Sequence, residues 1–162
     1  MNAEEKRIEI QFTLNGEKVK TEVLPGMTVL EMIRRNFKLT AAKEGCGKGE
    51  CGACSVLFNG LPINSCLKLA ATLTEKDSII TVEGLANDEL MQRIQKAYVE
   101  EGAVQCGFCI PGMTISSYYL LKKNPQPTME EIKHSLAGNI CRCTGYRKIE
   151  AAIVKAAERG NK

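Results

Sequence analysis

The chain lacks several features that would place it in common functional classes. Its 162 residues contain no tryptophan, only 5% aromatic residues and a single histidine, His134, which we expect to be solvated or structural. No apolar stretch approaches the roughly 20 residues that a membrane-spanning helix needs. Lysine and arginine are spread along the sequence without a long basic run, so we see no case for nucleic-acid binding.

Targeting signals and nucleotide-binding motifs are also missing. The first residues, MNAEEKRIEI, are charged and lead into an alternating strand pattern, which does not resemble a secretion signal. No glycine motif for a nucleotide stands between a strand and a helix. Eight cysteines without a secretion signal favour a reducing compartment and metal ligation over disulfides. We therefore expect a cytoplasmic, metal-binding protein.

The eight cysteines form two tetrads with different spacings. The first follows C-x4-C-x2-C-x11-C and the second C-x2-C-x31-C-x-C, which places them at Cys46, Cys51, Cys54 and Cys66 and at Cys106, Cys109, Cys141 and Cys143. The first three cysteines have the plant-type ferredoxin spacing, in which four thiolates hold a 2Fe–2S cluster. Glycines lie between them, and glycine permits the positive φ that a loop wrapped around an anionic cluster needs.

Zinc, disulfides and buried free thiols compete with a cluster at the first tetrad. Zinc sites more often show paired C-x2-C knuckles, and only Cys51 and Cys54 form such a pair here. The pattern therefore favours iron and sulfide over zinc at this tetrad.

The second tetrad lies where helices are expected to begin. Cys109 precedes Ile110-Pro111, and proline is common in a first helical turn. Cys143 precedes the last helix. Helix N-termini favour an anionic cluster, so iron–sulfur leads here and zinc is second. Two oxidised clusters, at about −2 each, would move the formal charge from +3 to about −1.

The first half of the chain is expected to consist of strands around one helix. Strands are predicted at Arg7–Leu14 and Lys18–Val23, joined by the turn former Asn15-Gly16. Thr28, with Glu31 three residues later, forms a capping box for a helix. A short strand, SVLFNG, then follows the cysteine loop, and 78–82 is predicted as the last strand.

The second half is expected to be helical. Helices are predicted from 89 to 102, from 111 to 121, after a second capping box at Thr128, and from 146 to 159. Together the halves predict an α+β protein. Residues 1–83 would form a β-grasp domain like that of plant-type ferredoxins, and residues 84–162 a four-helix bundle, each with one 2Fe–2S cluster.

Three segments resemble one family closely. EGCGKGECGAC at 44–54, VQCGFCIPGM at 104–113 and GNICRCTGY at 138–146 are similar to segments of the small iron–sulfur subunit of the molybdenum hydroxylases. That group includes xanthine, carbon monoxide, aldehyde and nicotinate dehydrogenases. The resemblance covers nearly the whole chain. One departure is Ile110, where many relatives have threonine, and it leaves the ligands untouched.

The resemblance implies an electron-transfer subunit that performs no substrate chemistry itself. In the family, a molybdenum–pterin centre in a large partner subunit oxidises the substrate. Electrons then pass to the helical-domain cluster, to the β-grasp cluster, and to a flavin or other acceptor in a third subunit. Gln105 and Cys143 would lie beside the partner's molybdopterin.

The implied assembly is a hetero-oligomer with a molybdopterin-binding large subunit and an FAD-binding medium subunit. Purines, aldehydes, N-heterocycles and carbon monoxide all remain open as substrates. Two other functions compete with this one, a free ferredoxin-like carrier with two clusters and a zinc-stabilised binding module.

Overall fold

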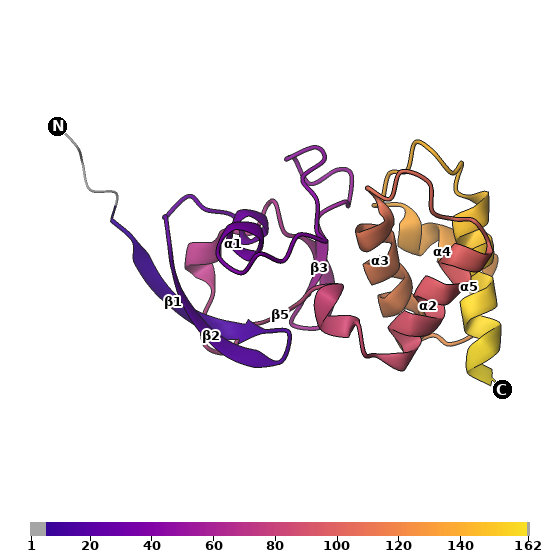
Figure 1. Cartoon of the computed structure of the whole chain (residues 1–162), viewed down its shortest axis with the longest axis horizontal. Helices are drawn as coiled ribbons and strands as arrows, with labels where there is room; N and C mark the ends of the chain where they lie inside the picture. Colours follow the sequence, from indigo (N-terminus) through magenta and orange to yellow (C-terminus); the bar gives the residue numbers. More distant parts are fainter. Residues whose placement is uncertain (1–5, 162) are drawn as a thin grey trace.

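The computed structural model describes residues 6–161 and shows an elongated molecule, with the sheet at one end and the main helices at the other (Figure 1). Residues 1–5, to which the prediction about a secretion signal chiefly applies, lie outside the described range. Within that range, no helix combines the length and the apolar character required to cross a bilayer.

The sheet has five strands in the order β2-β1-β5-β3-β4. The strands are β1 Ile8–Leu14, β2 Glu17–Val23, β3 Ser55–Phe58, β4 Leu61–Asn64 and β5 Ser78–Ile80. Strand β1 is antiparallel to β2 and parallel to β5, and β3 is antiparallel to both β5 and β4. The sheet is therefore mixed, with β2 and β4 at its edges.

Two Asn-Gly pairs form the hairpin turns. Asn15 and Gly16 have φ values of 51° and 89°, and Asn59 and Gly60 have 50° and 82°. Two consecutive positive φ values are typical of the type I′ turn, whose twist matches that of the flanking strands. The predicted hairpin at Asn15-Gly16 is confirmed by the pairing of Leu14 with Glu17.

The structure differs from prediction at two strands. Strand β4 was not expected as a strand, because LPIN is short and contains Pro62; proline is tolerated here because β4 is an edge strand. The last strand ends at Ile80 instead of residue 82. The N–H of Thr81 donates to the side chain of Asn15 at 2.9 Å, and a 3-10 turn over Glu83–Leu85 follows.

One short helix covers a face of the sheet. Helix α1 (Val29–Arg35) begins at Thr28, whose hydroxyl accepts from the N–H of Glu31 at 3.1 Å while the Glu31 carboxylate accepts from the Thr28 N–H at 3.0 Å. The predicted capping box is thus confirmed. Helix α1 lies over one face of the sheet (Figure 1), and its buried residues Leu30 and Ile33 belong to the same apolar cluster as residues of the strands.

Removing the Thr28 hydroxyl should weaken the start of α1. Thr28→Ala leaves the N–H of Glu31 without its side-chain acceptor, and such a change costs about 1 kcal/mol of the free energy of unfolding. Thr28→Ser keeps the hydroxyl and should restore most of this loss. Urea unfolding of both variants measures the difference, and equal stability of Thr28→Ala and wild type would contradict the prediction.

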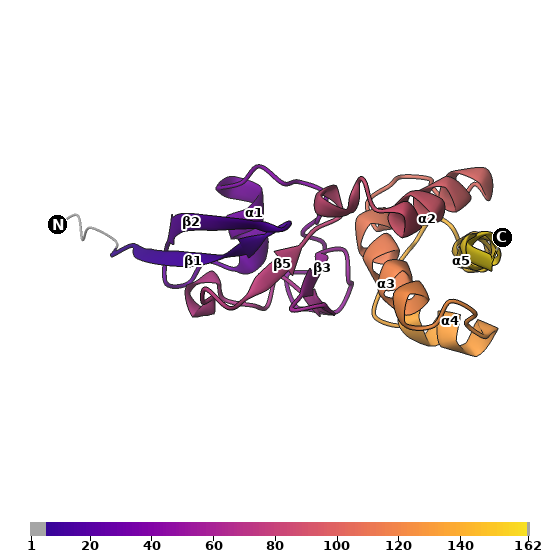
Figure 2. The ribbon, with the colours of Figure 1, turned by 90° about the horizontal axis from the view of Figure 1, so that it is seen from below.

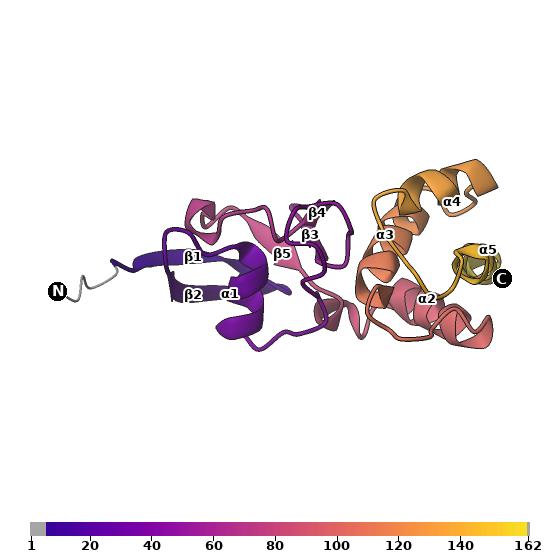
Figure 3. The same ribbon diagram turned by 90° about the horizontal axis from the view of Figure 1, so that it is seen from above.

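Four helices form the second half. They are α2 Glu89–Glu100, α3 Ile110–Lys123, α4 Met129–Leu136 and α5 Arg147–Glu158. Helix α3 is the one that faces the sheet, where it contacts β3 and β4, and α5 lies farthest from it (Figures 2 and 3). The observed helix α3 starts one residue before Pro111 and extends two beyond Leu121.

Buried apolar side chains fall into two clusters. One lies between the sheet and α1 and includes Phe12, Leu30 and Ile79. The other lies among α2, α3, α4 and α5, includes residues such as Met113 and Ile149, and reaches Leu57 of β3. Each half of the chain thus has apolar packing of its own, and the predicted α+β class is confirmed.

Candidate metal centres

The first tetrad is built on a loop between α1 and β3. Gly47, Gly49 and Gly52 in this loop have φ values of 64°, 79° and 66°, which only glycine adopts readily. These turns direct the backbone N–H groups of Lys48 and Glu50 to the sulfur of Cys46, at 3.3 Å each. These hydrogen bonds lower the pKa of the Cys46 thiol to about 6, so the loop itself stabilises the thiolate, even without a metal ion.

Two other thiols of this tetrad flank the β3–β4 hairpin, Cys54 just before β3 and Cys66 after β4. Cys54 is buried, and burial raises the pKa of its thiol to about 11. Ser65 donates its hydroxyl to the Cys54 carbonyl at 2.6 Å, which brings the following residue, Cys66, beside Cys54. A buried thiol with a raised pKa must be deprotonated when it becomes a metal ligand, so metal binding releases a proton there.

The second tetrad lies around the start of α3. Cys109 is the N-cap residue of α3, as the sequence predicts. The sulfurs of Cys106 and Cys143 are 3.5 Å apart and exposed to solvent. All four cysteines line a pocket of about 210 Å³, together with Phe108, Ile140 and Cys51 of the first tetrad.

Helix α5 begins at Arg147, one residue later than predicted, and Tyr146, with a φ of 67°, is its N-cap. Cys143 precedes the helix, as the sequence predicts. The chain also bends between Cys141 and Thr144, which leaves Cys141 buried and Cys143 exposed. Two successive residues with positive φ, Gly145 and Tyr146, explain the gap between the ligand segment and the helix.

Burial and hydrogen bonds act on the two buried thiols of the second tetrad. Burial raises the pKa of the Cys109 thiol to about 12. At Cys141 burial acts in the same direction, but the hydroxyl of Thr144, 3.1 Å from the sulfur, and the Thr144 N–H outweigh it and lower the pKa. Thr144 is a polar neighbour that the cysteine spacing alone did not single out.

The thiols approach one another in pairs. In the second tetrad, Cys106 adjoins Cys143 and Cys109 adjoins Cys141. In the first tetrad, Cys46 adjoins Cys51 and Cys54 adjoins Cys66. The two thiols of each pair are near enough to interact directly. Among residues 6–161, no three thiols, imidazoles or carboxylates converge on a point that one ion could occupy. Each iron of a 2Fe–2S centre takes two protein thiolates. The paired arrangement fits the dinuclear cluster.

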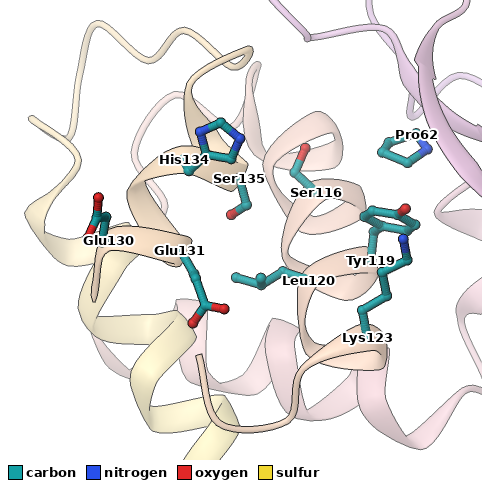
Figure 4. Close-up of a pocket in the computed structure, with 9 residues that line it drawn as sticks. All are labelled: Pro62, Ser116, Tyr119, Leu120, Lys123, Glu130, Glu131, His134 and Ser135. Carbon is teal, nitrogen blue, oxygen red and sulfur yellow. The ribbon is translucent and has the colours of Figure 1, made fainter. Parts of the chain in front are cut away.

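A larger pocket, of about 560 Å³, lies away from the cysteines. Its walls come from β4, α3 and α4, and Figure 4 shows Pro62, Tyr119 and His134 around it. His134 is exposed on α4, as expected for the only histidine. No cysteine lines this pocket, so its size does not mark it as the place of metal chemistry.

Gln105 lies next to Cys106 on the exposed side of the second tetrad, and Cys143 is exposed as well. Both residues are therefore accessible to a partner. The contact with a molybdopterin that the resemblance implies stays a prediction. The structure adds Asn139, a buried residue close to both tetrads, which the cysteine spacing did not indicate.

Comparison with known proteins agrees with this geometry. Residues 2–94 match the family described as "2Fe-2S iron-sulfur cluster binding domain", and residues 81–154 match the "[2Fe-2S] binding domain" family. The small FeS subunit of nicotinate dehydrogenase from Eubacterium barkeri is 49% identical over 94% of this chain and 97% of that protein. The iron-sulfur-binding subunit of xanthine dehydrogenase from Escherichia coli O157:H7 is 44% identical over 91% of this chain and 92% of that one.

A solved structure shows the same fold. The crystal structure of quinoline 2-oxidoreductase from Pseudomonas putida 86 contains a chain that superposes with a TM-score of 0.88, at 39% identity over 96% of both chains. Fold, paired thiols and both domain matches define a 2Fe–2S protein with two cluster-binding regions. The chain belongs to the family of small iron–sulfur subunits of the molybdenum hydroxylases.

Proposed function

We propose that this chain is the electron-transfer subunit of a molybdenum hydroxylase and that each cysteine tetrad holds one 2Fe–2S centre. The observation that carries the proposal is the pairing of the eight thiols in the two regions that match 2Fe–2S domains. When bound, each centre accepts and releases one electron. The chain's own residues supply thiolates, N–H donors and a fixed position for each centre.

The ligand assignment follows the pairs. In the first centre, Cys46 with Cys51 and Cys54 with Cys66 would each hold one iron; in the second, Cys106 with Cys143 and Cys109 with Cys141 would do so. The N–H groups of Lys48 and Glu50 donate to Cys46 and would offset the negative charge of the first centre. In the second centre, the hydroxyl of Thr144, 3.1 Å from the Cys141 sulfur, would have the same role.

We assign the boundary between two domains to residue 84. Residues 1–83 would form a β-grasp domain and residues 84–162 a four-helix bundle. The two apolar clusters support this division, since the described part of the first half packs around α1 and the second half around α3. Contacts of α3 with β3 and β4 join the domains into one elongated body.

The exposed apolar residues support a permanent place in a complex. Phe108 and Ile140 are 45% and 55% exposed next to the second tetrad, and Leu67 is 60% exposed next to Cys66. Large apolar side chains beside a redox site are typical of surfaces that a partner covers. We assign the Phe108 surface to the large molybdopterin subunit, with Gln105 and Cys143 toward the pterin, and the Leu67 surface to an FAD-binding subunit.

Two of the similar proteins are subunits of a nicotinate dehydrogenase and a xanthine dehydrogenase. By analogy, the substrate of the complex that contains this chain would be a related heterocycle, purine or aldehyde. Substrate choice belongs to the large subunit. Electrons would leave the second centre for the first and continue to the flavin. The complex would lie in the cytoplasm.

Co-purification tests this assignment against a free two-cluster carrier. A tagged chain isolated from its native host under mild conditions should bring with it a subunit that contains molybdenum and pterin, and an FAD-containing subunit. The same tag on a chain with Phe108→Glu and Ile140→Glu should recover less of the molybdenum subunit, and iron analysis of this variant checks that its own centres are intact. Isolation of the unaltered chain as a lone soluble protein would contradict the proposal.

A further inference from the structure

The loops that carry the two tetrads are joined by a direct hydrogen bond. The backbone N–H of Ile140, the residue before Cys141, donates to the backbone carbonyl of Cys51 at 2.9 Å. Cys51 belongs to the first tetrad and Cys141 to the second. A continuous connection of backbone bonds and one hydrogen bond therefore runs from a ligand residue of one tetrad to a ligand residue of the other.

Asn139 supports this connection from inside the molecule. Its Nδ2 donates to the carbonyl of Gly52 at 3.1 Å, and its Oδ1 accepts from the Ser116 hydroxyl at 2.6 Å. Asn139 is 5% exposed and Ser116 is 7% exposed. A buried amide that is bonded at both ends has one orientation, so Asn139 ties the Gly52 carbonyl to helix α3.

Two glycines allow the loops to come this close. Gly52 has a φ of 66°, and a Cβ there would overlap the carbonyl oxygen of Gly138 and the amide of Asn139. Gly112 lies in the first turn of α3, and a Cβ there would overlap the carbonyl oxygen of Gly52. Any side chain at either position would push the first cysteine loop away from the second.

We propose that Asn139 is a positioning residue for electron transfer between the two centres. With Ser116 it holds the Gly52 carbonyl against the segment that leads into Cys141. This inference rests on the proposed function, because it requires a centre at each tetrad. Asn139 is not a ligand candidate itself; it acts through the loops that carry the ligands.

The step that Asn139 would support is a single-electron transfer. One electron leaves the reduced centre of the second tetrad, which becomes oxidised, and reduces the oxidised centre of the first tetrad. No atom and no proton is transferred. Electron tunnelling weakens steeply with separation, so residues that hold the two loops together control its rate even though they contribute no ligand.

The test compares variants of the intact complex by EPR spectroscopy after full reduction with dithionite. Both centres are then paramagnetic, and their magnetic interaction depends on the distance between them. Asn139→Ala should keep full iron and the g values of each centre, but it should weaken the magnetic interaction. Electron equilibration between the centres, followed by rapid-freeze EPR after flash photoreduction, should be slower in Asn139→Ala than in the wild type.

Two alanine substitutions at glycine provide a matched pair. Gly112→Ala inserts a methyl group against the Gly52 carbonyl, whereas Gly138→Ala, one residue before Asn139, meets no atom within 4 Å. We expect Gly112→Ala to weaken the magnetic interaction and slow the transfer like Asn139→Ala. Gly138→Ala should match the wild type in both measurements.

Ser116 separates positioning from folding. Ser116→Ala removes the hydrogen bond to Asn139 and should shift both measurements in the same direction as Asn139→Ala, to a smaller extent. Ser116→Thr keeps the hydroxyl at this position, in the wall of the 560 Å³ pocket (Figure 4). Ser116→Thr should therefore restore both measurements to near the wild-type values.

Unchanged magnetic interaction and unchanged transfer in Asn139→Ala and Gly112→Ala, with full iron, would overturn the inference. If Asn139→Ala loses iron, the Ser116→Ala variant is used in its place. An unchanged magnetic interaction in Ser116→Ala would then overturn the inference as well. Absence of iron from the wild type itself would refute the proposed function instead. The two failures are therefore distinguishable in one set of samples.

Discussion

Replacing Cys143 by alanine should remove one iron–sulfur centre and leave the other in place. Cys143 adjoins Cys106 with 3.5 Å between the sulfurs, so the variant leaves one iron with a single thiolate from that pair. Iron should fall from about four to about two atoms per chain, since each 2Fe–2S centre holds two. The side-chain change itself should cost little because Cys143 is exposed, so a loss of stability in this variant reports the loss of the centre.

A matching substitution in the first tetrad tests whether each tetrad holds its own centre. Cys46→Ala should remove the centre of the first tetrad, whose loop and apolar surroundings belong to the other half of the molecule. EPR spectra of the two reduced variants should then show complementary signals, one from each centre. In the complex, both variants should block electron flow to the acceptor. Loss of both signals in Cys143→Ala alone would contradict separate sites.

Alanine at Gly52 should destabilise the protein far more than alanine at Gly47. Both glycines have nearly the same φ, 66° and 64°, so both substitutions carry the left-handed backbone penalty of about 1–2 kcal/mol. They differ in the space around the new methyl group. At Gly47 the nearest atom is Oε1 of Glu44 at 3.5 Å, an ordinary contact with a flexible side chain.

At Gly52 the new methyl group would overlap the carbonyl oxygen of Gly138 and the amide of Asn139. Such overpacking typically costs about another 1–3 kcal/mol, which gives a total of about 2–5 kcal/mol. Native-state hydrogen exchange at the amides of residues 53–57 measures the free energy of opening in the iron-loaded protein. Equal losses in Gly52→Ala and Gly47→Ala would show that the close approach of the two cysteine loops has no energetic consequence.

Features set by neighbouring residues could be predicted from the sequence. The Asn15-Gly16 turn, the capping boxes at Thr28 and Thr128, and the cap position of Cys109 all depend on residues a few positions apart. The glycines between the cysteines likewise predicted the positive φ values of the first cysteine loop. These signals are local, so they do not require knowledge of how the halves pack.

Features that depend on distant residues could not be predicted in this way. The bond between Asn139 and Gly52 joins residues 87 positions apart, and no periodicity or motif relates them. Strand β4 was missed because a four-residue edge strand with a proline has almost no pattern, and it is defined by its partner β3. The end of β5 depends on Asn15, which lies 66 positions away from Thr81.

The central claim is that one chain positions two separate 2Fe–2S centres on paired thiols. Quantitative EPR of the fully reduced protein, combined with iron and sulfide analysis, tests this claim most directly. The account predicts about four iron and four sulfide atoms per chain and two distinct signals of one spin each, one for each tetrad. A colourless protein that contains zinc and no iron, or a single signal that accounts for all the iron, would contradict it.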